Sequence, residues 1–175
     1  MKNIIIYGSH YGTTKQYADE LSKKTNINSI SFEKVSHVND YDNIIYIGGL
    51  YAGGVLGMSK TLKKINNISN KKIIIVTVGL ADPTDKTNIS NIRNNIKNQI
   101  SRDIFEKAKI FHLRGGIDYS KLNFAHKTMM KLLYNAVKNL PEEKQTPEDR
   151  AMIETYNKKV NFIDFSGLDK IINKI

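Results

Sequence analysis

The stretch NIIIYGSHYGTTK, residues 3–15, contains a strand pattern, a glycine-containing loop and the start of a helix pattern. Residues 3–7 form an apolar run without polar alternation, which is typical of a parallel strand that is covered on both faces. Beyond the loop, Tyr17, Ala18 and Leu21 recur at helical spacing. The sequence therefore predicts a strand–loop–helix unit at the start of the chain.

The same order of elements recurs along the chain. Residues 43–47, 73–78 and 109–113 predict further strands, and the alternation of Ile30 and Phe32 predicts a weaker strand at an edge. Strands that alternate with helices predict a doubly wound α/β domain. Apolar residues at helical spacing follow two of these strands. After residues 43–47 they are Met58, Leu62 and Ile65, and after residues 73–78 they form one expected helix face of Ile89, Ile92, Ile96, Ile100 and Ile104.

The late part of the chain departs from this alternation. Residues 119–140 carry an apolar stripe at helical spacing, which predicts an inserted helix. A second helix is expected to open at Thr146, with Pro147 in its first turn. Residues 160–165 are expected to be extended, and a short closing helix follows Gly167. The apolar stripe consists of Leu122, Ala125, Met129, Leu132, Leu133, Ala136 and Leu140.

Two interpretations of this stripe remain open. Apolar helix stripes are usually core, so we expect Met129, Met130, Leu132 and Leu133 to pack the insertion onto the sheet. The alternative is a helix that meets a membrane surface or a hydrophobic substrate. In that case the lysines of this stretch would face anionic headgroups, and they are Lys121, Lys127, Lys131 and Lys138.

The composition excludes several kinds of chemistry. The chain has 175 residues, no cysteine and no apolar run near the length of a membrane span, so we expect one domain, residues 1–175, in a soluble cytoplasmic protein. Without cysteine there is no thiolate nucleophile, zinc ribbon or cysteine-ligated iron–sulfur cluster. The histidines lack metal-binding spacing and there is no GxSxG elbow, so we assign no metal ligand and no catalytic side chain.

The net charge of +10 fits nucleic acid, an anionic membrane or an acidic protein as partner. Lysine supplies most of the positive charge, and it is poorly suited to the bidentate base readout of arginine. Nucleic-acid binding is therefore not favoured, and we interpret much of the surface as a solvated lysine-rich coat.

The loop GSHYGTTK, residues 8–15, is suited to a phosphate. A helix start offers backbone N–H groups and the positive end of its dipole, glycine allows close approach of the main chain, and hydroxyls are further donors. Its spacing is neither that of a Walker loop nor GxGxxG. A plain turn with hydroxyl caps and no ligand remains the alternative.

This loop resembles the phosphate loop of flavodoxins, which holds flavin mononucleotide (FMN) and has the pattern S/T-x-T-G-x-T. Ser9, Gly12 and Thr14 match, and Tyr11 stands where the middle threonine is usual. The resemblance covers nearly the whole chain. It implies a flavodoxin-like five-stranded parallel sheet of order 2-1-3-4-5 with helices on both faces. It also implies that FMN is the cofactor and that its phosphate is held by Ser9, His10, Tyr11, Gly12, Thr13 and Thr14.

Two further loops resemble the flavin-binding loops of that family. In the first, Tyr51 would stack on the isoalloxazine, and Gly53 would permit the peptide reorientation that lets a carbonyl accept a hydrogen bond from reduced N5. An ordinary half-buried tyrosine is the alternative for Tyr51. The second loop lacks a stacking aromatic, so Leu80 or a partner would cover the other face. The implied flavin contacts are Leu50, Tyr51, Ala52, Gly53 and Gly54 in the first loop and Gly79, Leu80, Ala81 and Asp82 in the second.

The fit is best to a branch with a long insertion, which includes the menaquinone-dependent protoporphyrinogen oxidases, and the insertion here would be about residues 117–158. The leading interpretation is an FMN-binding redox protein that mediates electron transfer. One alternative is an FMN-dependent oxidoreductase that acts on a hydrophobic substrate or quinone, and another is a non-catalytic basic binding module. The partner would be an acidic redox protein or a small hydrophobic or anionic substrate, and peripheral membrane contact through residues 119–140 is a further alternative.

Overall fold

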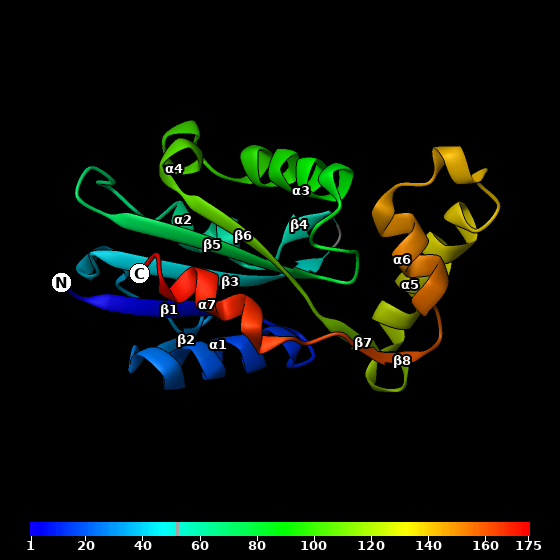
Figure 1. Cartoon of the computed structure of the whole chain (residues 1–175), viewed down its shortest axis with the longest axis horizontal. Coiled ribbons are helices and arrows are strands. Elements are labelled where there is room, and N and C mark those ends of the chain that lie inside the picture. Colours follow the sequence, from blue (N-terminus) through cyan, green and yellow to red (C-terminus); the bar gives the residue numbers. More distant parts are fainter. Residues whose placement is uncertain (52) are drawn as a thin grey trace.

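The computed structural model describes residues 1–51 and 53–175, and a parallel β-sheet lies at its centre (Figure 1). The strand order is β2-β1-β3-β5-β6, and every neighbouring pair along this path is parallel. This confirms the predicted five-stranded sheet of order 2-1-3-4-5. The strands are β1 (Asn3–Gly8), β2 (Ser29–Ser31), β3 (Asn43–Tyr51), β5 (Lys72–Gly79) and β6 (Lys109–Arg114).

Helices cover both faces of this sheet (Figure 1). The isoleucine and valine side chains of the inner strands are buried on both faces, as apolar runs without alternation predict. One face packs against α1 (Thr13–Thr25) and the C-terminal helix α7 (Leu168–Ile172). The opposite face packs against α2 (Met58–Leu62), α3 (Lys86–Gln99) and α4 (Arg102–Lys107).

Local capping divides a helix that the sequence predicts to be continuous. The isoleucines from Ile89 to Ile104 do not lie on one helix, because α3 ends at Gln99 and Ile100 is extended with φ −128° and ψ 166°. The hydroxyl oxygen of Ser101 then accepts a hydrogen bond from the backbone N–H of Ile104 and starts α4. The expectation of a single helix face is wrong, although both helices bury isoleucines against the same side of the sheet.

Two short strands lead the chain away from the sheet. β7 (Gly116–Asp118) and β8 (Lys159–Asn161) pair antiparallel, and Figure 1 shows them between the sheet and a separate helical part. We call residues 119–158 the helical arm. It contains α5 (Phe124–Val137), α6 (Pro147–Thr155) and the 3-10 turns η2 (Tyr119–Lys121) and η3 (Glu142–Lys144), whereas η1 (Val38–Asp40) and η4 (Phe165–Gly167) lie outside it.

Helix α6 starts at the predicted cap. The hydroxyl oxygen of Thr146 accepts a hydrogen bond from the N–H of Asp149 at 3.1 Å, and the carboxylate of Asp149 accepts one from the N–H of Thr146 at 2.9 Å. Pro147 occupies the first turn, where its missing N–H is not needed. This capping box satisfies two backbone donors that the helix itself leaves free.

Helix α5 lies outside the core of the sheet. It begins at Phe124 rather than near residue 119, because the side chain of Asn123 accepts a hydrogen bond from the N–H of His126 at 2.8 Å and caps it. None of its described side chains is fully buried, and Leu132 is 66% exposed. The expectation that its apolar stripe packs onto the sheet is wrong, because the β7–β8 ladder places α5 beyond the sheet, where it packs against α6 (Figure 1).

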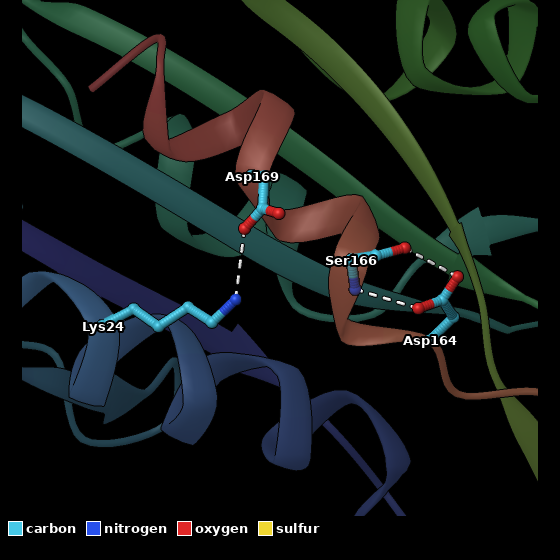
Figure 2. A network of polar contacts seen from close by, with 4 residues as sticks. All are labelled: Lys24, Asp164, Ser166 and Asp169. Atoms are coloured by element: carbon cyan, nitrogen blue, oxygen red, sulfur yellow. Dashed lines mark hydrogen bonds and ion pairs between the residues drawn. The ribbon is translucent and has the colours of Figure 1, made fainter.

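The C-terminal segment returns from β8 to the sheet, and only the first part of the predicted extended run is a strand. The carboxylate of Asp164 accepts hydrogen bonds from the N–H and the hydroxyl of Ser166, at 2.9 and 2.8 Å (Figure 2). Lys24 of α1 lies 3.1 Å from the carboxylate of Asp169 in α7. Exposed ion pairs contribute little, so we attribute the docking of α7 to its two fully buried apolar side chains.

Tyr17 of α1 ties this segment to the sheet. Its side chain is 1% exposed, and its hydroxyl donates to the carbonyl of Arg114 at 2.7 Å and accepts from the N–H of Asp164 at 3.0 Å. Tyr17→Phe leaves both backbone groups without this partner, so we expect the free energy of unfolding to fall by about 2 kcal/mol. Urea denaturation measures the change. Tyr7→Phe is the control, since that hydroxyl makes no hydrogen bond within the described chain, and equal losses in both variants would contradict the role of Tyr17.

Candidate functional site

A cavity of about 890 Å³ opens at the carboxyl ends of the parallel strands. Its walls come from the loops that follow β1, β3 and β5, from α3 and from the helical arm. In open α/β sheets ligands bind at this edge, where the strand order reverses. The size is in the range of cofactor and small-molecule sites, so this cavity is the candidate site.

The β1–α1 loop presents an open helix N-terminus beside the cavity. Gly12 precedes α1 with φ 92°, a left-handed conformation that glycine adopts without strain. The hydroxyl oxygen of Ser9 accepts a hydrogen bond from the N–H of Gly12 at 3.0 Å, while no side chain among the described residues caps α1. The first-turn N–H groups and the positive end of the helix dipole are therefore available to an anion.

A tight hairpin forms the second wall. The two-residue strand β4 (Gly54–Val55) pairs antiparallel with Leu50 and Tyr51 at the end of β3, and Gly53 in the turn has φ 78°. Gln99 of α3 holds this hairpin, since its Oε1 accepts a hydrogen bond from the N–H of Val55 at 3.0 Å. The sequence did not predict β4, because two residues carry no periodicity.

The β5–α3 loop is fixed by neighbouring elements. Nε of Arg114 donates to the carbonyl of Leu80 at 2.8 Å, and Nδ2 of Asn88 donates to the carbonyl of Asp82 at 2.6 Å. The carboxylate of Asp82 accepts from both the N–H and the hydroxyl of Thr84 at 2.7 Å, and these bonds hold its pKa below the usual value. Asp82 thus stabilises its own turn, whereas Leu80 lies on the cavity wall.

Aromatic side chains gather where the β1–α1 loop, the hairpin and the helical arm meet. The ring centroid of His10 lies 4.9 Å from that of Tyr51 and 5.1 Å from that of His126. The ring centroids of Tyr51 and His126 are 5.2 Å apart. The hydroxyl of Tyr11 forms a hydrogen bond with Nδ1 of His126. Burial lowers the pKa of His10, and the charge of His126 lowers it further against a smaller opposing effect of Glu33. This lowered pKa favours the neutral form of His10.

The wall formed by α3 is polar. Asn88, Asn91 and Asn95 recur at spacings of three and four along α3 and line the cavity. On the adjoining strands, Nδ1 of His112 lies 2.8 Å from the hydroxyl of Thr77. Neither Nε2 of His112 nor Oδ1 of Asn88 has a hydrogen-bond partner among the described residues. These two atoms leave one polar corner of the cavity free to bind water or a ligand.

The pKa of His112 is lowered to about 4, chiefly by burial and secondarily by the charge of Arg93. Its unfolded pKa is about 6.5, so the unfolded state binds more protons below that pH and stability falls as the pH drops through this window. The full shift would correspond to about 3 kcal/mol, but His112 is only partly buried, and solvent screening reduces the expected contribution to about 1–2 kcal/mol.

The variant His112→Asn isolates this effect, because its amide oxygen retains an acceptor for Thr77. We expect the loss in free energy of unfolding between about pH 7 and about pH 4.5 to be smaller in the variant by about 1–2 kcal/mol, as measured by urea denaturation. An identical pH dependence in both proteins would show that His112 does not carry the acid sensitivity.

The helical arm contributes an apolar wall, which includes Met129, Met130 and Leu133 of α5 and Met152 of α6. Over residues 1–51 and 53–175, the His, Asp and Glu side chains form no group of three or more that could hold a metal ion. Every helix in the described part of the chain is too short or too polar to cross a bilayer. The cavity thus combines an anion-accepting loop, a polar wall and an apolar wall.

Most residues of the predicted site lie at this cavity. Gly12 and Asp82 belong to its loops but are not part of its wall, and Ala52 lies outside the described residues. His112 and His126 line the cavity too, although sequence reasoning found no role for them. The predicted residues on the wall are Ser9, His10, Tyr11, Thr13, Thr14, Leu50, Tyr51, Gly53, Gly54, Gly79, Leu80 and Ala81.

Flavodoxins occur among the solved structures that are similar to this chain. Oxidised flavodoxin 1 from Bacillus cereus is 16% identical, with 81% of this chain and 100% of that chain covered and a TM-score of 0.41. A Fusobacterium nucleatum flavodoxin bound to flavin mononucleotide is 19% identical, with 71% of this chain and 75% of that chain covered and a TM-score of 0.43. No curated protein matches the chain.

The match to a family model is more extensive. The model is described as a flavodoxin domain, and it matches residues 4–144, from β1 through the three cavity loops to the end of η3. The matched segment therefore reaches every strand of the central sheet and the open N-terminus of α1. This chain belongs to the flavodoxin domain family.

Proposed function

We propose that this protein binds FMN in the cavity and mediates electron transfer. One observation carries the proposal: the three loops of a flavodoxin domain converge on a single cavity beside an uncapped helix N-terminus. When bound, the flavin would supply the electron chemistry, while the protein supplies position and electrostatics.

The residues present fit this cofactor. The backbone and hydroxyls of the β1–α1 loop would hold the phosphate, and a Cβ added at Gly12 meets no atom within 4 Å, so space for a ligand is open there. Tyr51 would stack on one flavin face, and Leu80 would cover the other. Gly53, with φ 78°, provides the backbone freedom for a peptide to reorient toward the flavin.

The test is the visible absorption spectrum of the freshly purified protein, followed by release and identification of the chromophore. We expect bound FMN, or uptake of added FMN by apoprotein to one equivalent. A colourless protein that fails to take up FMN would refute the proposal and leave the non-catalytic binding module in its place.

The partner in this function would be another redox protein, and we propose that it is acidic. The net charge of +10 favours an acidic surface through long-range attraction. We further propose that residues 1–175 form one flavodoxin-like domain with an insertion at about 117–158, which the β7–β8 pairing encloses, and that it works in the cytoplasm. The rate of electron transfer to an acidic partner should fall steeply as salt is added, and a rate independent of salt would contradict this choice.

The outer surface of the helical arm also fits an anionic membrane. Phe124 is 87% exposed and Leu132 is 66% exposed, and the exposed Lys127 and Lys131 lie on the same helix. Exposed apolar side chains beside lysines are typical of interfacial helices. Co-sedimentation with anionic vesicles should exceed that with neutral vesicles and should be reduced by Phe124→Ser, and equal binding to both vesicles would refute the membrane contact.

A further inference from the structure

Tyr11 stands at the one position where the β1–α1 loop departs from the threonine of the family pattern. Its side chain is 42% exposed, so burial in a core does not explain a large aromatic residue there. Instead, its hydroxyl bonds with residues that lie more than a hundred positions further along the chain, at the start of α5.

Two hydrogen bonds join Tyr11 to the helical arm. Its hydroxyl oxygen accepts from the backbone N–H of Asn123 at 3.2 Å and bonds with Nδ1 of His126. A phenol hydroxyl can both donate and accept, so one oxygen can bond with the backbone of Asn123 and the ring of His126 at once. The cap of α5, from Asn123 to His126, is therefore attached to the β1–α1 loop.

Few other hydrogen bonds join the described part of the arm to the sheet domain. The root of the arm is fixed by the β7–β8 ladder and by the hydroxyl of Thr13, which donates to the carbonyl of Gly116 at 3.4 Å. Within the described chain, no other hydrogen bond joins α5 or α6 to the sheet, its loops or its covering helices. Packing supports the other side of the arm, since α6 contacts α3 and α5 contacts α6. The N-terminal end of α5, which has no fully buried side chain, is joined to the β1–α1 loop by the hydroxyl of Tyr11.

We infer that Tyr11 is a positioning residue that holds the helical arm against the β1–α1 loop and keeps His126 on the cavity wall. We call its two hydrogen bonds, to Asn123 and His126, the latch. With the latch closed, the ring of His126 lies 5.2 Å from that of Tyr51 and 5.1 Å from that of His10. The arm then forms a wall of the cavity, which the apolar side chains of Met129 and Leu133 extend.

If FMN binds as proposed above, the latch also affects the cofactor. Because the loop that would hold the phosphate also holds the arm, FMN binding and arm closure are coupled. Coupling is reciprocal, so FMN protects the arm, and an open arm releases FMN faster.

Hydrogen exchange of the apoprotein tests the latch without any cofactor. Tyr11→Phe keeps the ring and removes the hydroxyl, and we expect amides of residues 123–137 to exchange about tenfold faster while sheet amides stay unchanged. Tyr7→Phe is the matched control, since it removes a phenol hydroxyl that makes no hydrogen bond within the described chain. Unchanged exchange of α5 in Tyr11→Phe would overturn the inference.

A second variant distinguishes loss of the Tyr11–His126 bond from a nonspecific destabilisation of the helical arm. His126→Leu should also raise the exchange of α5. The double variant should exceed Tyr11→Phe by less than twofold, because Tyr11→Phe already breaks the bond to His126 that His126→Leu removes. Fully multiplicative effects would overturn the shared bond. In the FMN-loaded protein, Tyr11→Phe should speed FMN dissociation about tenfold, and an unchanged rate would overturn the coupling. Failure of the wild type to bind FMN would refute the proposed function alone, because exchange in the apoprotein would still decide the latch.

Discussion

Replacing Gly12 with valine is expected to weaken FMN binding by at least about 100-fold, which corresponds to about 2.7 kcal/mol. Gly12 has φ 92°, a conformation that a β-branched residue rarely adopts, and its backbone lies where the main chain would approach the phosphate. The added methyl groups would occupy the open space beside the loop. Titration of apoprotein with FMN, followed by flavin fluorescence, gives the dissociation constant.

The rest of the fold should survive this change. A Cβ at Gly12 meets no atom of the protein within 4 Å, so only the local strain of about 1–2 kcal/mol remains, and the near-ultraviolet circular dichroism should be unchanged. Riboflavin, which lacks the phosphate, is the matched ligand control, and its affinity should change less than threefold. If the variant binds FMN as tightly as the wild type does, the phosphate is held elsewhere.

The sheet could be predicted because its signal is local. Residues 73–78 are all β-branched and, apart from Thr77, apolar, and such a run is typical of a strand that is covered on both faces. The two-residue strand β4 has no comparable signal, and its pairing with β3 depends on a turn and on the distant side chain of Gln99. Long apolar strands are therefore visible in the sequence, and short paired segments are not.

The helix boundaries show a different limit. The isoleucine spacing from residue 89 to residue 104 continues across the break between α3 and α4, because both helices bury the same face against the sheet. Hydrophobic periodicity reports which face is buried, and it does not report whether the backbone is continuous. The break is marked instead by Ser101, a capping residue whose preference for a helix start could have been weighed against the period.

The candidate site was predictable in part for a topological reason. Three loops follow the carboxyl ends of neighbouring parallel strands, so topology alone brings Ser9, Tyr51 and Leu80 to one edge. His126 reaches the same cavity only because the β7–β8 ladder and the bond to Tyr11 direct the helical arm there. No pattern within the sequence encodes a contact between positions 115 residues apart.

Replacing Gly8 with valine is expected to lower the free energy of unfolding by about 3 kcal/mol or more. A Cβ on Gly8 would lie 2.2 Å from the carbonyl oxygen and 3.0 Å from the carbonyl carbon of Leu56, both backbone atoms. That carbonyl cannot swing away easily, because it accepts a hydrogen bond from the buried hydroxyl of Tyr46 at 2.5 Å. The end of β1 or the segment after β4 must therefore move, and urea denaturation measures the cost.

Gly49→Ala is the control for this clash, because its Cβ would meet only the hydroxyl of Thr14 at 3.0 Å and the more distant carbonyl of Gly8 at 3.7 Å. A side-chain hydroxyl can rotate, so we expect a loss of about 1 kcal/mol or less. The test is the difference between the two variants in the loss of free energy of unfolding. If Gly8→Val lowers it no more than Gly49→Ala does, β1 does not pack against a fixed Leu56 carbonyl. If the expected difference is found, the close approach of two backbone segments fixes the distance between the first two cavity loops.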